Sequence, residues 1–385
     1  MKRNKYEIDM CNGTIMDKLI SFSLPLMLTS ILQLMFNAVD IIVVGRFSGS
    51  DALAAVGSTT ALINIFTNLF IGISLGANVL AARYYAAGRD QEMSESVHTA
   101  IALALVSGVI MAFVGFAMSR FALELMDTPG DVIGQSTTYM RIYFLGMPFF
   151  MLYNYGAAIL RAVGDTKRPL MFLCAAGLAN VALDLLLVIV IPLDVAGVAI
   201  GTVASQMVSC ILVLRCLHRT EGSYQLRFSK LRIRAVYLKR IFQVGIPAGI
   251  QSTVINFSNA MLQSSVNSFG SIAMAGYTAA NNILGFLYVS VNAVTQACMS
   301  FTSQNYSVGK QKRMDRVLTD CMILSAGAAL VLGVGAYVFG SRLLGIYTSD
   351  AEVVQCGLEI LSITTVPYFL CGIMDLFPGA LRGMG

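Results

Sequence analysis

The sequence predicts an all-α polytopic membrane protein, and three observations carry this prediction: few charged residues, long uncharged segments and an internal repeat. Of the 385 residues, 56% are hydrophobic and 12% are charged, whereas a soluble domain has roughly 25% charged residues. The longest uncharged segment runs from Ile241 to Gly309. It far exceeds the roughly 20 residues that a helix needs to cross a membrane.

The individual spans follow from cutting the chain at charged or turn-rich segments, which leaves ten continuously apolar stretches. Each is long enough for a helix that crosses about 30 Å of hydrocarbon at about 1.5 Å per residue. A porin-type barrel is excluded because its strands would alternate apolar and polar residues. The ten predicted helices cover residues 18–44, 52–80, 96–119, 133–160, 169–192, 196–214, 241–265, 273–300, 318–340 and 353–379.

The distribution of Lys and Arg predicts which ends of the helices face the cytoplasm. The N-terminus and the even-numbered loops hold 22 of these residues, whereas the odd-numbered loops hold three, Arg46, Arg120 and Arg342. Basic residues concentrate in the cytoplasmic loops of membrane proteins. The sequence therefore predicts a cytoplasmic N-terminus. The net charge of +5 reflects this topology and does not indicate a nucleic-acid partner.

Several function classes need residues that the sequence does not provide. The chain has two His and no C-x-x-C pair among its eight Cys, so we expect no His-rich metal centre and interpret the Cys as packing residues. No G-x-x-x-x-G-K-[ST] loop and no H-E-x-x-H motif occurs. We therefore expect neither an enzyme nor an ATP-driven motor, and no cofactor or ATPase subunit is implied.

An internal repeat with an offset near 222 residues relates the two halves of the chain. Pro25 falls on Pro247, and the Leu-Arg-x-x-Gly element at 160–164 falls on the same element at 381–385. Because six spans separate the two starts, the copies are parallel repeats, as in the halves of some transporters. Two further spans follow this element in the first copy, whereas the second copy ends with it.

We therefore expect two lobes joined by a basic linker. The N-terminal lobe covers residues 15–218 and has six transmembrane helices, and the linker covers residues 219–240. The C-terminal lobe covers residues 241–385 and has four helices, so we expect it to be incomplete by two. The linker is interpreted as a solvated cytoplasmic segment, with a lipid-binding or regulatory patch as the alternative.

Ionisable side chains inside the apolar spans mark a candidate ion site, because a charge in a span is costly unless it faces protein or water. Counted along their spans from the cytoplasmic end, Asp40 in the first span and Asp184 in the fifth both lie in the outer half of the membrane. Asn180 precedes Asp184 by one helical turn, and Thr202 in the sixth span lies at a similar depth. These oxygen groups suit Na⁺ or a proton shared between carboxylates. The alternative is that they only cross-link helices.

Other polar or helix-bending residues form a second group of candidates. Tyr139 lies near the outer end of the fourth span, and Asn154 in the same span aligns with Asp375 in the repeat. These three residues are candidates for substrate contact or a proton relay. Asp375 is either a second protonation site or a member of a local pair. Pro25 and Pro247 occupy matching positions in spans one and seven and predict bendable helices.

Three stretches of the sequence resemble the multidrug and toxic compound extrusion (MATE) family, in the bacterial branch found in Gram-positive organisms. They are FSLPLMLTSILQLMFNAVDIIVVGRFSGSDALAAVG, YFLGMPFFMLYNYGAAILRAVGDTKRP and LANVALDLLLVIV, and the second half ends with FPGALRGMG. The resemblance covers residues from about Thr14 to Gly385. It implies two six-helix lobes around a V-shaped central cavity, with the last two helices of the second lobe lacking here.

The resemblance also implies a function and a set of site residues. Such proteins lie in the bacterial plasma membrane and exchange Na⁺ or H⁺ for cationic, lipophilic drugs by alternating access. The positions that match the coupling site in the N-terminal lobe of some members are Asp40, Asn180, Asp184 and Thr202, with Tyr139 and Asn154 nearby. The kink proline of helix one matches Pro25. Other members place a Glu in helix seven beside an acid in helix ten, whereas here helix seven has no acid and Asp375 remains.

The sequence thus predicts a cation-coupled exporter of small amphipathic organic cations. One alternative is an inactive or regulatory membrane fragment of such a transporter, which would insert into the membrane without transporting. Another is a lipid-linked oligosaccharide flippase, which needs a cationic central cavity for pyrophosphate. The second alternative is disfavoured because Arg141 is the only Lys or Arg that lies away from the ends of the predicted spans.

Overall fold

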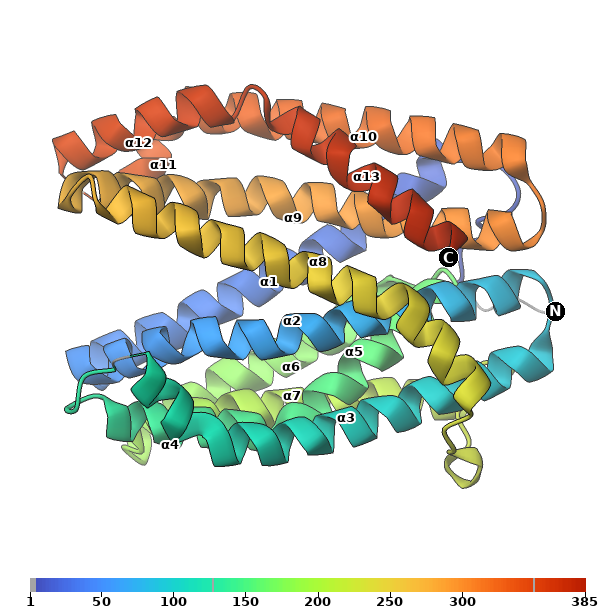
Figure 1. Ribbon diagram of the computed structural model, residues 1–385, viewed down its shortest axis with the longest axis horizontal. Coiled ribbons are helices and arrows are strands. Elements are labelled where there is room, and N and C mark those ends of the chain that lie inside the picture. Colours follow the sequence, from blue (N-terminus) through green and yellow to red (C-terminus); the bar gives the residue numbers. More distant parts are fainter. Residues whose placement is uncertain (1–4, 127, 349) are drawn as a thin grey trace. The chain divides into compact units, whose positions relative to one another are not determined.

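The computed structural model describes residues 5–126, 128–348 and 350–385, and every regular element within them is a helix (Figure 1). The predicted all-α class is confirmed. The elements are α1 Met16–Phe47, α2 Ser50–Ala86, α3 Asp90–Leu125, α4 Ile133–Leu145, α5 Met147–Ala162, α6 Lys167–Leu185, the π-helix η1 Leu186–Val190, α7 Asp194–Arg219, the 3-10 helix η2 Phe228–Lys230, α8 Ala235–Asn267, α9 Ser271–Ser307, α10 Gln311–Val338, α11 Gly340–Leu344, α12 Ala351–Thr364 and α13 Tyr368–Met384.

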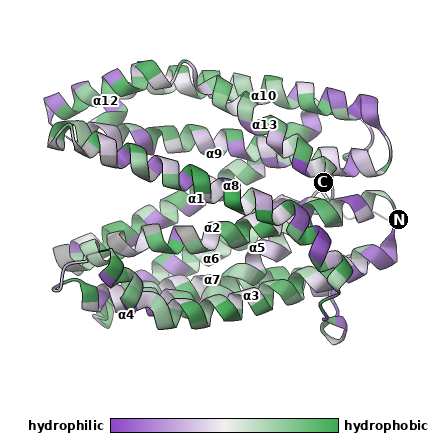
Figure 2. Cartoon of the chain, viewed as in Figure 1, coloured by the Kyte–Doolittle hydropathy of each residue, from purple (hydrophilic) through white to green (hydrophobic). Residues whose placement is uncertain are grey.

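The helices have the length and surface of membrane spans. Among the described residues, seven single helices are long and apolar enough to cross a membrane, and two bent pairs raise the number to nine. Figure 2 shows hydrophobic residues along the helices. Phe113, Leu178 and Val331 are 75%, 74% and 73% exposed, which suits contact with lipid tails rather than water. The chain is therefore a multi-pass membrane protein. The predicted span 241–265 falls in α8, which is not among the nine segments, so the count of ten stays a prediction.

Two spans that the sequence predicts as single helices are each a bent pair of helices. The pair α4 and α5 bends by 46° and is interrupted at Gly146, and the pair α12 and α13 bends by 53°. Pro148 lies in the first turn of α5, and Pro367 immediately precedes α13. Proline lacks the N–H that a continuing helix needs and clashes with the preceding turn. The predicted single helices 133–160 and 353–379 are therefore each two helices.

The chain forms two compact units, and their division falls inside α1 and α8. Unit 1 comprises the start of the chain to Glu7 and Leu28–Ser252, and unit 2 comprises Ile8–Met27 and Thr253–Gly385. These bounds differ from the lobes that follow the repeat in the sequence, and the predicted lobe boundaries stay a prediction.

The two helices that contribute to both units also carry the matching prolines of the repeat. Both α1 and α8 continue through Pro25 and Pro247 as helices. The last residue of α1 that belongs to unit 2 is Met27, and the last residue of α8 that belongs to unit 1 is Ser252. In each helix, the boundary between the two units therefore lies within two turns after the proline.

In unit 2, the first part of α1 packs against α9, a helix of the other repeat. Phe22 meets Phe301 edge to face, with ring centroids 5.8 Å apart and ring planes at 88°. Both rings are fully buried in a cluster that includes Leu19 and Leu26. This geometry is favourable for aromatic rings, and the apolar face of α1 fixes the helix to this unit.

In unit 1, the first part of α8 crosses α2 at two pairs of glycines. A Cβ atom at Gly72 would overlap the Gly249 backbone, and a Cβ atom at Gly76 would lie 3.0 Å from the Gly245 nitrogen. Each helix thus carries a G-x-x-x-G pair at the crossing. Small residues with this spacing allow membrane helices to approach backbone to backbone.

Candidate functional site

The candidate ion site lies within unit 1, where α6 and α7 approach closely because α7 presents two glycines. A Cβ atom at Gly197 would lie 3.1 Å from the backbone carbonyl of Leu187, and a Cβ atom at Gly201 would overlap Asp184 Oδ1. Gly197 and Gly201 are four residues apart and therefore share a helix face. The absence of side chains on this face allows the Asp184 carboxyl group to lie directly against α7.

The backbone departs from α-helical geometry directly after Asp184. Helix α6 ends at Leu185 and continues as the π-helix Leu186–Val190 before the chain turns into α7. A π-helical segment carries an extra residue in its turn and often occurs at functional sites. Here it lies beside the Gly197 contact, at the end of the helix that carries both Asn180 and Asp184.

The structure brings Asp40, Asn180, Asp184 and Thr202 together from three helices. Thr202 Oγ1 donates to Asp40 Oδ2 at 3.3 Å, and Asn180 Nδ2 donates to Asp184 Oδ2 at 3.2 Å. Asp40, Asn180 and Asp184 are 7%, 4% and 0% exposed, and Thr202 is half-buried. The four residues thus form one buried polar cluster that joins α1, α6 and α7. Their predicted role in ion coupling stays a prediction.

The two carboxyl groups of the cluster are direct neighbours. They lie close enough for a hydrogen bond between them once one of the two carries a proton. Oδ1 of Asp40 and Oδ1 of Asp184 are both buried and have no hydrogen-bond partner in the described part of the chain. Two adjacent buried carboxylates are costly without a counter-charge. The arrangement is therefore suited to hold a proton or a cation.

No basic side chain among the described residues forms an ion pair with either aspartate. The base that the sequence places in the same part of the chain, Arg141, instead has its guanidinium over the Phe116 ring, 5.0 Å from the centroid. Within residues 5–126, 128–348 and 350–385, no group of three or more His, Cys, Asp or Glu side chains converges to hold a metal ion. A cation at this site would therefore need the Asn180 and Thr202 oxygens besides the two carboxylates.

Two tyrosines of α4 lie beside the carboxyl pair. Tyr139 and Tyr143 stack with ring centroids 6.2 Å apart and ring planes at 27°. Tyr139 is within electrostatic range of both aspartates, and Tyr143 is within range of Asp40. The Tyr143 hydroxyl also interacts with Gln206 of α7. The predicted residue Tyr139 thus borders the cluster, and its function stays a prediction.

The other two candidates for substrate contact or a proton relay lie elsewhere. Asn154 of α5 donates through Nδ2 to its own helix, at the Phe150 carbonyl oxygen 2.9 Å away. Asp375 lies in unit 2 on α13, half-buried and within electrostatic range of Arg382 and of the Tyr288 hydroxyl. Asp375 therefore has a basic neighbour on its own helix. Both alternatives that the sequence left open for Asp375, a second protonation site and a local pair, stay predictions.

Sequence reasoning missed three residues of this region, Tyr143, Gly201 and Gln206. Tyr143 follows Tyr139 by one helical turn, and Gln206 follows Thr202 in the same way. Residues four apart share a helix face, so this spacing was the signal for both. Gly201 could have been found through its spacing from Gly197, since small residues at this interval mark close helix pairs.

Comparisons with known proteins agree with this architecture. The MatE family model matches residues 25–186 and 247–385. The "Probable multidrug resistance protein YoeA" of Bacillus subtilis is 28% identical over 373 residues, which cover 94% of this chain and 80% of that protein. The "Multidrug export protein MepA" of Staphylococcus aureus strain MSSA476 is 23% identical over 373 residues, covering 95% of this chain and 81% of that protein.

A solved structure shows that the fold is shared as well. It is described as the outward-facing conformation of a multidrug resistance MATE family transporter of the MOP superfamily. It has a TM-score of 0.92 and 21% sequence identity, and the match covers 100% of this chain and 86% of that chain.

Proposed function

Because the chain belongs to the MatE family of transporters, we propose that it is a secondary active antiporter that exports cationic lipophilic compounds from the cell. Export is coupled to the entry of Na⁺ or H⁺ by alternating access. The observation that carries this proposal is the buried pair of Asp40 and Asp184, two adjacent carboxyl groups without an ion pair in the described part of a membrane-spanning bundle.

The class of transported compound is supported by the names of the relatives and by the aromatic residues next to the site. The relatives from Bacillus subtilis and Staphylococcus aureus are named for multidrug resistance and multidrug export. Tyr139 and Tyr143 provide aromatic faces next to the carboxyl pair. Aromatic faces attract organic cations, and carboxylates neutralise them, so a lipophilic cation and the coupling ion would compete for the same charges.

The coupling chemistry follows from the oxygen groups of the cluster. Within the described part of the chain, Oδ1 of Asp40 and Oδ1 of Asp184 have no hydrogen-bond partner. Asn180 keeps its carbonyl oxygen available because its Nδ2 is the atom that donates. With the Thr202 hydroxyl, this is a hard-oxygen set of the kind that alkali cations prefer. The same carboxyl pair accepts a single proton equally well. Na⁺ and H⁺ are therefore both retained as coupling ions.

A conformational change is supported by the two helices that belong to both units. Pro25 and Pro247 lie within two turns of the positions at which α1 and α8 change unit. Proline removes one backbone hydrogen bond from a helix and lowers its resistance to bending. We propose that both helices act as hinges during alternating access. The excess of basic residues in the even-numbered loops supports a cytoplasmic N-terminus in the plasma membrane.

Transport of ethidium by inside-out membrane vesicles tests the proposal. A Na⁺ gradient at constant pH and a pH gradient without Na⁺ are applied in turn, and ethidium uptake is followed by fluorescence. We expect one of the two gradients to drive uptake, and Asp184→Asn and Asp40→Asn each to reduce it to the level of vesicles without the protein. Asp315→Asn is the matched control, because Asp315 is an exposed residue of α10.

The outcomes separate the alternatives. Unchanged uptake in the Asp184→Asn variant would reject the site assignment. Normal insertion of the unaltered chain with no uptake under either gradient would instead favour a non-transporting membrane protein.

A further inference from the structure

A polar cavity in unit 1 lies between the beginning of α3 and the basic segment that leads into α8. Its volume is about 520 Å³, within the range of small-ligand sites. From α3 it is lined by Gln91, Ser94, Glu95 and His98. These four residues have the spacing of a single helix face, so the cavity has one continuous helical wall. None of them belongs to the candidate ion site.

The opposite wall is part of the segment 219–240 that the sequence predicts to be a linker, and this part contacts α3. Tyr224 and Leu226 are buried. The Arg227 backbone N–H donates to His98 Nε2 at 3.1 Å, and the Arg234 backbone N–H donates to Thr99 Oγ1 at 3.4 Å. Backbone hydrogen bonds of this kind fix the course of the segment. They hold its side chains in place around the cavity.

The carboxylate of Glu95 and the imidazole of His98 already accept hydrogen bonds from protein groups. Glu95 Oε2 forms an ion pair with Arg234 at 2.9 Å and accepts a hydrogen bond from the Tyr237 hydroxyl at 2.9 Å. Glu95 Oε1 accepts from Gln91 Nε2 at 3.3 Å. Since His98 Nε2 accepts a backbone N–H, its Nδ1 carries the proton and donates to the Ser94 carbonyl oxygen at 2.6 Å. The negative charge of Glu95 is thus balanced by Arg234.

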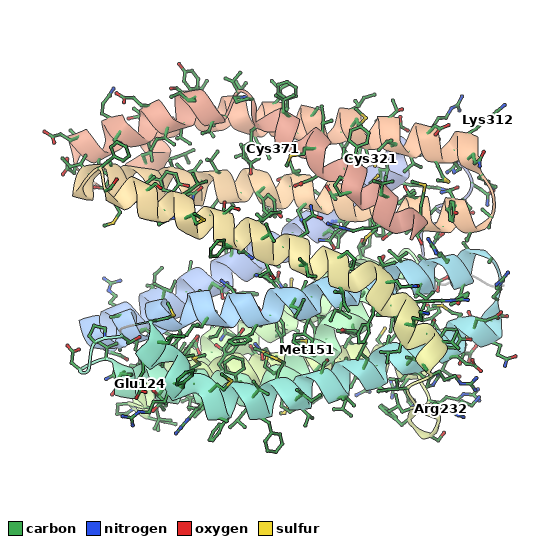
Figure 3. All side chains as sticks on the ribbon, in the orientation of Figure 1. Glu124, Met151, Arg232, Lys312, Cys321 and Cys371 are labelled. Atoms are coloured by element: carbon green, nitrogen blue, oxygen red, sulfur yellow. The ribbon has the colours of Figure 1, made fainter. Side chains whose placement is uncertain are left out.

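The remaining charged groups of the cavity are donors. Lys230 and Arg232 line the cavity, and in the described part of the chain no hydrogen bond or ion pair engages either side chain, although Arg232 lies within electrostatic range of Glu95. Figure 3 labels Arg232 in the segment before α8. The hydroxyls of Ser94 and Ser229 add two neutral donors. With three basic side chains and one carboxylate in its lining, the cavity carries a net positive charge, which is the complement of a phosphate group.

We propose that this cavity binds a phosphate group, carried either by the headgroup of an anionic lipid or by a small soluble phosphate compound. Lys230 and Arg232 provide the charge, and Ser94 and Ser229 donate to the remaining phosphate oxygens. The lipid source is favoured by neighbouring apolar side chains, since Phe228, Ile233 and Val236 are 53%, 41% and 61% exposed. Basic residues next to exposed apolar ones are typical of segments that lie at an anionic membrane surface.

The test uses the full chain purified in detergent. Lipid retention is measured by native mass spectrometry after addition of phosphatidylglycerol or phosphatidylcholine, and the soluble source is tested by titrating inorganic phosphate in phosphatidylcholine nanodiscs while following thermal stability. The double variant Lys230→Gln/Arg232→Gln removes the two charges. Its matched control is Arg215→Gln/Arg219→Gln, which removes two exposed charges of α7 that do not line the cavity.

We expect the double variant to bind phosphatidylglycerol about 30-fold more weakly, because each lost basic group accounts for roughly a fivefold loss in affinity for an anionic lipid surface. The control is expected to bind like the unaltered chain. Ser94→Leu fills the cavity while keeping every charge and should weaken binding as well, which separates a site from general surface charge. A loss confined to inorganic phosphate would support the cavity with a soluble ligand.

Equal effects of the two double variants, or no effect of either lipid or phosphate, would overturn the proposal. None of these measurements depends on transport, so failure of the proposed function would not affect them.

Discussion

Gly201 of α7 lies directly against the Asp184 carboxylate of α6, so that a Cβ atom at position 201 would occupy the space of Asp184 Oδ1. This Oδ1 has no hydrogen-bond partner among the residues that the structure describes. The position of the carboxylate therefore depends on a residue that has no functional group of its own.

The variant Gly201→Ala is expected to impair ion coupling without removing any oxygen atom. Overpacking at such a contact costs about 1–3 kcal/mol. If Asp184 moves to relieve it, the apparent affinity for the coupling ion falls roughly 5- to 150-fold. The ion dependence of ethidium uptake measures this change. Gly134→Ala in α4, where a Cβ atom would meet nothing within 4 Å, is the control, and equal ion affinity in both variants would contradict the close contact.

Thr202 provides a second prediction, because its hydroxyl has one proton and two acceptors within reach. Oγ1 lies 3.3 Å from Asp40 Oδ2 and 2.9 Å from the Val198 carbonyl oxygen. Thr202→Val keeps the shape of the side chain and removes the hydroxyl. A hydrogen bond to a charged group is worth about 1.5–3 kcal/mol, so we expect a tenfold or larger loss in ion affinity. Thr202→Ser should restore most of the affinity. A Val variant with unaltered affinity would mean that the hydroxyl bonds only to its own helix.

The sequence was sufficient to predict the members of the polar cluster, because an aspartate in a long apolar segment is detectable without knowledge of the fold. Asp40 and Asp184 were found in this way, and Asn180 followed from its spacing on the same helix face. The contact of Thr202 with Asp40 of α1 needed the structure, and so did the distance between α6 and α7. That distance is set by Gly197 and Gly201, two residues that hydropathy patterns do not distinguish from their neighbours.

The bends of the helices could not be predicted from the presence of proline alone. Helices α1 and α8 continue through Pro25 and Pro247, whereas the breaks occur next to Pro148 and Pro367. A proline inside a long helix removes one hydrogen bond, and packing on both sides decides whether the helix continues. The extra signal at Pro148 was the adjacent Gly146, because glycine lowers the stability of the helix at the same point.

The glycine crossing between α2 and α8 in unit 1 predicts that alanine substitutions at two glycines of α2 will change the stability of the protein by different amounts. A Cβ atom at Gly76 would overlap the Ile241 carbonyl oxygen, whereas a Cβ atom at Gly57 would meet nothing within 4 Å. Gly76→Ala is therefore expected to destabilise the fold by about 1–3 kcal/mol. Gly57→Ala should be neutral or slightly stabilising, because alanine favours the helix. Thermal unfolding of both detergent-solubilised variants measures the difference, and equal midpoints would contradict the crossing.

The turn between α5 and α6 predicts the effect of a buried charge on folding. The Asp165 side chain is fully buried, and its Oδ1 accepts the Arg168 backbone N–H at 3.1 Å while Oδ2 pairs with the Arg168 guanidinium. The same guanidinium reaches α7, where Nη1 lies 3.1 Å from Cys216 Sγ. Asp165 therefore both accepts a backbone N–H from the first turn of α6 and holds the arginine that connects α6 to α7.

Asp165→Ala is expected to lower the free energy of unfolding by about 2–4 kcal/mol, because it removes the acceptor of this backbone N–H and leaves a largely buried guanidinium without its partner. Asp165→Asn should cost less, since the amide oxygen still accepts the backbone N–H. The exposed Asp315 provides the control in Asp315→Ala, and thermal unfolding in detergent gives the order of stability. If Asp165→Asn were as unstable as Asp165→Ala, the charge of the ion pair would outweigh the hydrogen bond to the backbone N–H. The double variant Asp165→Ala/Arg168→Gln then separates the two contributions, because it has no unpaired guanidinium. The stability that it regains relative to Asp165→Ala measures the cost of leaving Arg168 without its partner, and the loss that remains includes the missing hydrogen bond to the backbone N–H.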